Sequence, residues 1–422
     1  MIPTRAFYLL TVTRWFPVGM VVGQFVLLQT ERGNSTSQAL TALALSGLAC
    51  FLFELPTSGF ADAFGRRPVY IAAAVLNVVV AALYLTAQSF WQFALAGAAM
   101  GVFRALDSGP LEAWVVDEIH RDRPGVDVDR ELSRSGTVMG ISMALSALLG
   151  GALIWWHPVE EFSAITGAVF LYVVLNVVHL VAVLRFMHEP DLQRGDGLRR
   201  ALATARETPK VIASGVRLMR ADRVLLALIL VEVFWSIGMI SFESLLPIRL
   251  TEFLGDESRA GALMGPIAAG GWAIFAFGTA IAGWSSPRIG IARTAMLGRV
   301  LNSVGAIVMG LAAGPVALVA AYLFTYTFHG TNGPPHAALL HRQATRENRA
   351  TVLSMNSMMA FLSFAVAAPL VGLLADRTST ALAIVVCGVT GLVGVLGYLP
   401  ARRAEAQRKG LDDSVEVTSL PM

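Results

Sequence analysis

Residues 51–88 read FLFELPTSGFADAFGRRPVYIAAAVLNVVVAALYLTAQ, and the second part of this stretch decides the fold class. From 68 to 88 the chain is apolar almost throughout and has no charged side chain. A helix needs roughly 20 such residues to cross the hydrocarbon core of a bilayer. A strand of a membrane barrel is about half as long and alternates between apolar and polar residues. This run does not alternate, so it predicts a membrane-spanning helix.

Apolar runs of similar length follow one another along the whole chain. Of the 422 residues 55% are hydrophobic and 14% are charged, whereas soluble domains carry about 25% charged residues. Only helices and closed barrels satisfy their backbone groups in lipid. We therefore predict an all-α membrane protein with twelve transmembrane helices. The predicted spans cover about residues 7–30, 38–61, 68–88, 90–114, 136–156, 162–186, 222–247, 260–284, 291–313, 315–336, 351–375 and 380–400.

The longest polar interruption, residues 187–221, divides these spans into two sets of six. Such a division is the hydropathy signature of transporters built from a duplicated unit. We predict two pseudo-symmetric six-helix bundles, over 1–186 and 222–400, joined by a cytoplasmic linker. The centre of this linker has an amphipathic helical pattern. The polar tail, 401–422, is expected to be disordered.

The distribution of basic residues predicts the orientation. With the N-terminus inside, the cytoplasmic segments contain 25 basic residues, the external loops contain four, and three lie within spans. Cytoplasmic loops of membrane proteins carry such an excess. We predict a multi-pass protein of the bacterial inner membrane with both termini in the cytoplasm. Arg14 interrupts the first apolar run and no small-residue cleavage site follows, so this run is expected to be a retained span.

The sequence argues against several other classes of protein. The net charge of +3 comes from arginines of short loops, which membrane topology explains, so no nucleic-acid partner is expected. Cys50 and Cys387 form neither a disulfide framework nor a metal-ligand pattern, and no metal or cofactor is expected. The chain has no P-loop and no HExxH motif, so we assign no catalytic residue. A membrane-embedded enzyme or a sensor is the remote alternative.

The loop that precedes residues 68–88 carries a motif. Four of its positions match the loop signature between spans two and three of the major facilitator superfamily, which this chain resembles: Asp62, Gly65, Arg66 and Arg67. Ala63 stands where that signature usually has Arg. The resemblance implies a latch that holds the two halves together on the cytoplasmic side. In it Asp62 caps a helix end or pairs with Arg67, and Arg67 also pairs with Asp117. Alternatively, the arginines only anchor the loop inside the cell.

Span four also resembles this superfamily. Arg104, followed by Asp107 and Gly109, is similar to a fourth-span signature in which the Arg is implicated in proton coupling and Gln usually replaces Asp107. A charge near the bilayer midplane is costly unless it faces a partner or a wet cavity. Asp107 lies three residues after Arg104, close enough to pair with it on one helix face. The alternative is a purely structural ion pair.

Ionisable residues inside spans are few, and such residues usually mark ion or substrate pathways. Glu54 is our first choice as proton carrier, because burial favours the protonated form of a carboxyl group. Arg14 or Arg104 is its expected neighbour. For each acid, the alternative is an ion pair that only packs helices together. The candidate residues of the proton or substrate pathway are Arg14, Glu54, Arg104, Asp107, Glu112, Glu232, Glu243 and His329.

Span ten contains His329 and His336, seven residues apart, in a stretch that Pro334 and Pro335 are expected to kink. His329 has a side chain that titrates near neutral pH when it is unperturbed. The alternative is a hydrogen-bonded histidine in a kinked helix.

Two segments of the second half echo the loop motif of the first. GWSSPRIG, residues 283–290, follows span eight, but Pro287 stands at its acidic position. GLLADR, residues 372–377, matches in part, at the external end of span eleven. We interpret both as family character and not as a second latch.

Span five bears on the direction of transport. Exporters of this superfamily carry a glycine-rich signature that ends in Gly-Pro-x-x-Gly-Gly. Gly140, Gly150 and Gly151 fit this signature, whereas Ser146 and Ala147 stand where Gly-Pro is usual. The resemblance implies a monomeric, proton-coupled exporter, an antiporter of small amphipathic compounds that works by alternating access. A proton-coupled or facilitative importer of a small metabolite is the alternative.

Overall fold

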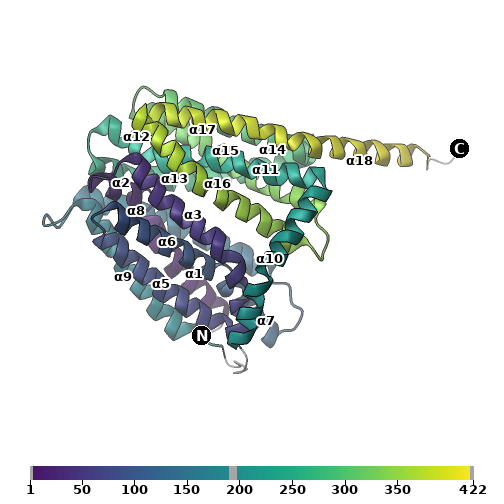
Figure 1. Ribbon diagram of the computed structural model, residues 1–422, viewed down its shortest axis with the longest axis horizontal. Coiled ribbons are helices and arrows are strands. Elements are labelled where there is room, and N and C mark those ends of the chain that lie inside the picture. The colour runs from purple at the N-terminus through teal and green to yellow at the C-terminus, as the bar shows by residue number, and fades with distance from the viewer. Residues whose placement is uncertain (1–2, 190–196, 419–422) are drawn as a thin grey trace. The chain divides into compact units, whose positions relative to one another are not determined.

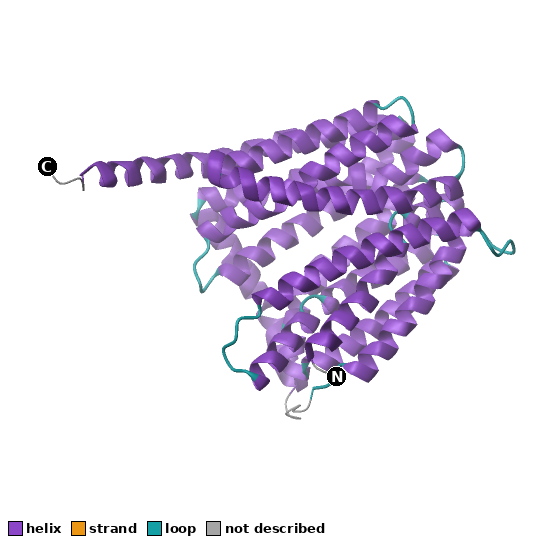
Figure 2. Cartoon of the chain, turned by 180° about the vertical axis from the view of Figure 1, so that it is seen from behind, coloured by secondary structure: helices purple, strands orange, loops and turns teal. Residues whose placement is uncertain are grey.

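The computed structural model describes residues 3–189 and 197–418, and helices are the only regular structure in them, as Figures 1 and 2 show. The helices are α1 (Pro3–Met20), α2 (Gln24–Glu31), α3 (Thr36–Ser58), α4 (Phe60–Phe64), α5 (Arg66–Thr86), α6 (Phe90–Asp107), α7 (Pro110–Asp122), α8 (Asp129–Trp156), α9 (Ala164–Phe186), α10 (Gly197–Ala221), α11 (Arg223–Met239), α12 (Leu245–Leu254), α13 (Glu257–Ile289), α14 (Ile291–Leu311), α15 (Pro315–Gln343), α16 (Arg349–Arg377), α17 (Thr380–Gly394) and α18 (Leu399–Thr418). A π-helical turn, Ile240–Ser244, joins α11 to α12, and a 3-10 turn, Val395–Tyr398, joins α17 to α18.

Ten helical stretches of the described residues are long and apolar enough to span a bilayer. They match ten of the twelve predicted runs in order, and α6 and α15 match the other two. The prediction of an all-α membrane protein is confirmed. The predicted span over 90–114 is not one helix, because it breaks between α6 and α7. Gly109 has a φ of 91° at this break, a conformation that L side chains rarely adopt.

The linker contains α10, which follows the amphipathic pattern predicted there. Residues 190–196 of the predicted linker lie outside the described part of the chain. The predicted disorder of the tail differs from the structure, in which α18 continues to Thr418. Residues 401–409 consist of Ala, Arg, Glu, Gln and Lys, which favour helix, and this explains the helix over the first part of the tail. Residues 419–422 of the predicted tail lie outside the described part of the chain.

Polar side chains lie inside the bundles, and apolar ones cover much of their outer surface. Asn77, Asn176 and His179 are buried between α5, α9 and α1, whereas Val181 on α9 is 58% exposed. The Asn77 amide nitrogen donates to the Asn176 side-chain oxygen, and Thr13 hydrogen-bonds His179. This distribution is typical of a protein whose outer solvent is lipid, where polar groups must find partners inside.

The described residues pack into two compact units. Unit 1 consists of Met1–Pro209 together with Glu243–Trp272 and Phe364–Thr380. Unit 2 consists of Lys210–Phe242, Ala273–Ser363 and Ala381–Met422. Two pieces of the second half of the chain therefore pack with the first half.

Specific contacts attach these two pieces within unit 1. The Gln24 side-chain amide donates to the carbonyl of Gly261, at 3.0 Å. The Asp376 carboxylate accepts hydrogen bonds from the first two backbone N–H groups of α3, each at 3.0 Å. A carboxylate at a helix start satisfies N–H groups that have no partner within the helix. The GLLADR segment thus provides a cap for α3, a role that the sequence did not suggest.

The two halves repeat one local structure, which supports the predicted duplication. Gly65 precedes α5 with φ 96° and ψ 155°, and Gly290 precedes α14 with φ 93° and ψ 151°. In both cases a glutamate caps the first two N–H groups of the helix. Glu189 caps α5 at 3.0 and 2.9 Å, and Glu405 caps α14 at 3.1 and 3.0 Å. The GWSSPRIG segment is therefore the structural counterpart of the first-half loop, although its acidic position is lost.

Candidate functional site

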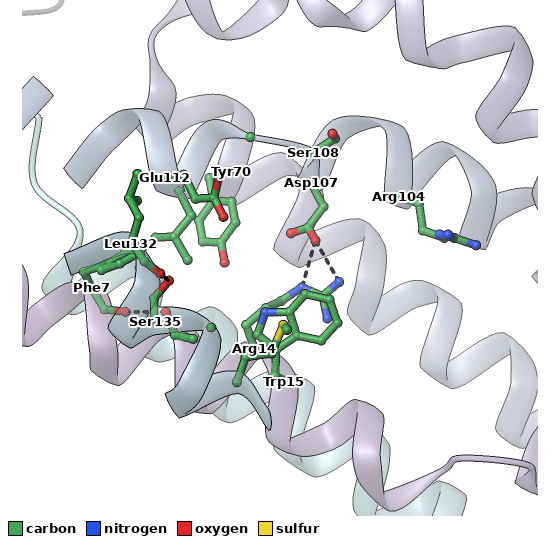
Figure 3. A pocket seen from close by; sticks show the side chains of 15 residues that line it. Phe7, Arg14, Trp15, Tyr70, Arg104, Asp107, Ser108, Glu112, Leu132 and Ser135 are labelled. Atoms are coloured by element: carbon green, nitrogen blue, oxygen red, sulfur yellow. Dashed lines mark hydrogen bonds and ion pairs between the residues drawn. The ribbon is translucent and has the colours of Figure 1, made fainter. Parts of the chain in front are cut away.

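Unit 1 contains a cavity of about 450 Å³ inside the helices of the first half, which Figure 3 shows from close by. Side chains from α1, α5, α6, α7 and α8 line it, together with the break between α6 and α7. Four of its lining residues are ionisable members of the predicted pathway: Arg14, Arg104, Asp107 and Glu112. The structure thus brings together half of the eight candidates in one hollow.

Arg14 and Asp107 form an ion pair in this cavity. The Arg14 Nε and Nη2 atoms donate to Asp107 Oδ2 at 2.9 and 2.7 Å. The Arg14 guanidinium also lies 4.9 Å from the Trp15 ring and 4.8 Å from the Phe103 ring. Its Nη1 atom is buried and has no hydrogen-bond partner among the residues described. The pair joins α1 to the end of α6.

The predicted pairing of Asp107 with Arg104 is wrong. Figure 3 shows the Arg104 side chain directed away from Asp107, while the Asp107 carboxylate faces Arg14. Asp107 is the last residue of α6, directly before the break. Because the helix does not continue past it, its side chain is free to turn toward α1 instead of back along its own helix.

Arg104 is exposed to the cavity and is the charged neighbour of Glu54 on α3. Arg104 is one of the two neighbours predicted for Glu54, whereas the other, Arg14, forms an ion pair with Asp107. The Glu54 Oε2 atom is buried and lacks a hydrogen-bond partner within the described ranges. Glu54 itself does not line the cavity.

Glu112 lies on the first turn of α7 and is exposed in the cavity. Figure 3 shows Glu112 and Arg104 at opposite ends of the hollow, with the pair of Arg14 and Asp107 between them. The cavity therefore has an acidic side chain, Glu112, at one end and a cationic side chain, Arg104, at the other. A solute with a charged group of either sign has a complementary side chain to approach.

Unit 2 contains a second buried group of ionisable residues, centred on Glu232 of α11. Glu232 Oε1 lies 3.4 Å from Arg299 Nη2 and 3.2 Å from His336 Nε2. The Tyr398 hydroxyl lies 2.8 Å from His336 Nδ1 and accepts from Arg299 Nε at 3.2 Å. All four side chains are buried. Their arrangement is a continuous hydrogen-bonded network across four helical segments.

The sequence named Glu232 as a candidate but did not identify its partners. Arg299 is one of the three basic residues that the sequence places within spans, and His336 was noted only through its spacing from His329. The signal that was available is their residue type, since ionisable residues inside spans usually pair with one another. Which of them converge depends on the rotation of each helix, which one sequence does not give.

His329 lies in an aromatic environment and not in this network. Its ring centroid is 5.1 Å from those of Trp235 and Tyr326 and 5.3 Å from that of Phe242. Glu243 is exposed, in the π-helical turn between α11 and α12. Neither residue lines the cavity of unit 1. The His329 Nδ1 atom is buried and has no hydrogen-bond partner among the described residues, so the structure does not show the hydrogen-bonded histidine of the alternative.

The loop motif forms ion pairs, but with a different arginine from the one predicted. Arg66 pairs with Asp62 and with Asp117, the latter at 3.4 Å. Arg67 instead donates its Nη2 hydrogen to the Leu184 carbonyl at 3.3 Å. Arg66 is the first residue of α5, so successive side chains point about 100° apart around the helix. Because of this rotation, Arg66 and not Arg67 faces Asp62 of α4 and Asp117 of α7.

Comparison with protein-family models gives a match to the Major Facilitator Superfamily over residues 7–344 and 272–420. This chain belongs to the major facilitator superfamily. The match spans both halves, as the duplicated local structure before α5 and α14 leads one to expect. Among curated protein sequences, none matches this chain.

Three solved structures of similar fold are transporters. A nucleoside transporter, NupG, has a TM-score of 0.74 at 9% identity and covers 95% of this chain and 99% of its own. A POT family transporter in complex with 5-aminolevulinic acid has a TM-score of 0.70 at 14% identity, with coverage of 93% and 94%. A proton-dependent oligopeptide transporter has a TM-score of 0.68 at 16% identity, with coverage of 96% and 99%. At these identities the likeness establishes the fold alone.

Proposed function

We propose that this protein is a secondary active transporter that moves small organic molecules in exchange for protons. The observation that carries the proposal is the cavity of unit 1, in which Arg14, Arg104, Asp107 and Glu112 gather inside membrane-spanning helices. Ionisable side chains at membrane depth that face a hollow are typical of substrate and proton pathways. Membership of the major facilitator superfamily supports the same class of function.

The substrate class follows from the lining of the cavity. Charged groups of both signs lie beside Trp15, Phe7 and Tyr70, so the hollow suits a compact amphipathic molecule with at least one charged group. Its volume of about 450 Å³ is within the range of small-molecule sites. Structures of similar fold include a nucleoside transporter and a transporter in complex with 5-aminolevulinic acid, which supports solutes of this size.

We propose export as the direction, with import by the same fold as the second candidate. The support is the glycine pattern of span five. A Cβ atom on Gly150 would lie 2.5 Å from the Met20 carbonyl oxygen, and one on Gly151 would lie 2.5 Å from the Ala262 carbonyl oxygen. These glycines therefore serve the close approach of α8 to α1 and α13, which is where small residues are used in membrane bundles.

Proton binding is proposed at Glu54, because its unpaired oxygen lies near Arg104, which reaches the cavity. A cationic group of a substrate bound in the cavity would favour the ionised form of Glu54, so that substrate binding and proton binding oppose each other, as exchange requires. The second candidate is Glu232, whose carboxylate already has Arg299 and His336 as partners.

Both termini are proposed to lie in the cytoplasm of a bacterial cell, and the protein is proposed to act as a monomer. In this orientation the Asp376 cap of α3 and the Gln24–Gly261 hydrogen bond lie toward the external side. Both contacts join segments of the two sequence halves within unit 1.

The test is proton movement in liposomes that contain the purified full chain. A panel of lipophilic cations, nucleosides, short peptides and amino-acid-like acids is added on one side, and internal pH is recorded. The proposal expects one class to drive proton counterflow with wild type, and Glu54→Gln to abolish it. Glu347→Gln is the matched control, because Glu347 is exposed in the loop between α15 and α16.

The outcomes separate the alternatives. Proton flux in the same direction as substrate would replace export by import. Coupling that persists in Glu54→Gln but is lost in Glu232→Gln would move the proton site to unit 2. Substrate flux without any proton movement would exclude proton coupling.

A further inference from the structure

A second cavity lies in unit 2, apart from every residue of the proposed transport pathway. It has a volume of about 810 Å³ and is formed by the turn between α13 and α14, the end of α15 and the start of α18. The charged side chains that line it are four arginines and one glutamate: Arg288, Arg293, Arg342, Arg402 and Glu405.

The single acid in this cavity is already fully used. The Glu405 carboxylate accepts the first two backbone N–H groups of α14, at 3.1 and 3.0 Å. It also accepts a hydrogen bond from Arg342 Nη1 at 3.0 Å. The Glu405 carboxylate therefore caps a helix and pairs with Arg342. No ion pair joins it to Arg288, Arg293 or Arg402 among the described residues.

Two of the remaining arginines have no counter-charge. Arg293 and Arg402 are exposed to the cavity and have no hydrogen-bond or ion-pair partner in the part of the chain that the structure describes. Arg288 donates to the Trp284 carbonyl and stacks 4.3 Å from the Trp284 ring. Cations around one hollow repel one another unless an anion lies between them. The planar guanidinium fork matches the oxygens of a phosphate group.

The surroundings of the cavity indicate where that phosphate comes from. The turn that forms it joins two membrane-spanning helices, so it lies at a membrane surface. Trp284, beside the cavity, is 63% exposed, and Leu297 on α14 is 52% exposed. Tryptophan at the end of a span is typical of the lipid headgroup region. Apolar side chains next to a basic hollow suit a ligand with a phosphate and acyl chains.

We propose that this cavity binds the phosphate headgroup of an anionic phospholipid from the cytoplasmic leaflet. That leaflet carries anionic lipids, and basic pockets between helices on this side are suited to their headgroups. Soluble phosphate esters also carry a phosphate group, but they have no acyl chains to contact the exposed side chains of Trp284 and Leu297. The site would fix the α13–α14 turn and α18 to the membrane surface.

The experiment measures lipid binding by native mass spectrometry of the full-length protein in detergent. Phosphatidylglycerol is titrated against phosphatidylcholine for wild type, Arg293→Gln, Arg402→Gln and the double variant. Arg403→Gln is the matched control, because Arg403 is exposed on the same helix but does not line the cavity. We expect a preference for phosphatidylglycerol that falls about fivefold for each cavity arginine removed and is unchanged in the control.

Three results would overturn the proposal. The first is equal binding of the two lipids by wild type, and the second is an equal loss in Arg403→Gln. The third concerns the source of the phosphate: if inorganic phosphate at millimolar concentration displaces the lipid and itself binds with the same dependence on Arg293 and Arg402, the ligand is a soluble phosphate. Failure of inorganic phosphate to compete supports the lipid. No substrate is present, so the outcome does not depend on the proposed transport function.

Discussion

At the scale of single residues, the pair of Arg14 and Asp107 determines the electrostatics of the cavity in unit 1. Both side chains are largely hidden, with 8% and 16% of their surface exposed. An uncompensated charge at membrane depth costs at least a few kcal/mol. Because Arg14 Nη1 has no partner in the described ranges, Asp107 is the group that neutralises this arginine.

Replacement of Asp107 by asparagine should therefore destabilise the protein strongly. Removal of one partner from a buried ion pair costs about 3–5 kcal/mol, because the other charge stays buried without compensation. We expect a lower thermal unfolding midpoint of Asp107→Asn in detergent. The double variant Arg14→Met with Asp107→Leu should recover most of the loss, since it removes both charges.

Asp117→Asn is the control for this prediction. Asp117 also pairs with an arginine, Arg66, but 56% of its side chain is exposed. Exposed ion pairs contribute about 0–1 kcal/mol, so this variant should unfold close to wild type. If Asp107→Asn and Asp117→Asn lower the unfolding midpoint equally, the buried Arg14–Asp107 pair contributes no more to stability than the exposed Arg66–Asp117 pair.

At the scale of helices, α8 and α13 cross where two glycines meet. A Cβ atom on Gly265 would lie 2.5 Å from the Ala147 carbonyl oxygen and 2.8 Å from the Gly151 Cα atom. Real Cβ atoms do not approach backbone so closely, so a side chain here must push the helices apart. The contact joins a segment of the second half to the first half within unit 1. The two helices approach this closely because neither Gly151 nor Gly265 has a side chain.

Two alanine substitutions in α13 should therefore have opposite signs. Gly265→Ala should lower stability by about 1–3 kcal/mol, the usual cost of overpacking. Gly283→Ala lies on the same helix, is exposed and meets nothing within 4 Å. It should raise stability by up to about 1 kcal/mol, because alanine favours the helix over glycine. Thermal unfolding of both purified variants decides this, and equal shifts would mean that the crossing tolerates side chains.

At the scale of the whole molecule, the sequence predicts the helices well because lipid imposes one simple requirement. Each span must be long, apolar and internally hydrogen-bonded, and this requirement can be read from a single segment such as residues 68–88. The duplicated loop could also be recognised, since Gly65 and Gly290 occupy equal places in the two halves. Two of the predicted spans are divided inside an apolar run, one at Gly23 between α1 and α2 and one at Gly109 between α6 and α7.

The sites were harder to predict because they depend on pairs of distant residues. Arg14 and Asp107 are 93 positions apart, and Glu232 and Arg299 are 67 apart. Their convergence follows from how each helix is rotated about its axis, and hydropathy does not determine that rotation. The pairing of Arg66 instead of Arg67 has the same origin, since a change of one residue turns a side chain by about 100°. Residue type indicated which groups matter, but not which of them meet.

The orientation of the molecule leads to a last prediction, which follows from the distribution of arginines. The loop between α8 and α9 contains no arginine or lysine from 157 to 163, whereas the loop between α15 and α16 contains Arg346. A cysteine at Glu160 should react with a membrane-impermeant maleimide in intact cells, and one at Glu347 should react only after the membrane is opened. Cys50 and Cys387 are buried and should contribute little background. The reverse pattern of labelling would invert the orientation, and it would also move the arginine-lined cavity of unit 2 to the external leaflet.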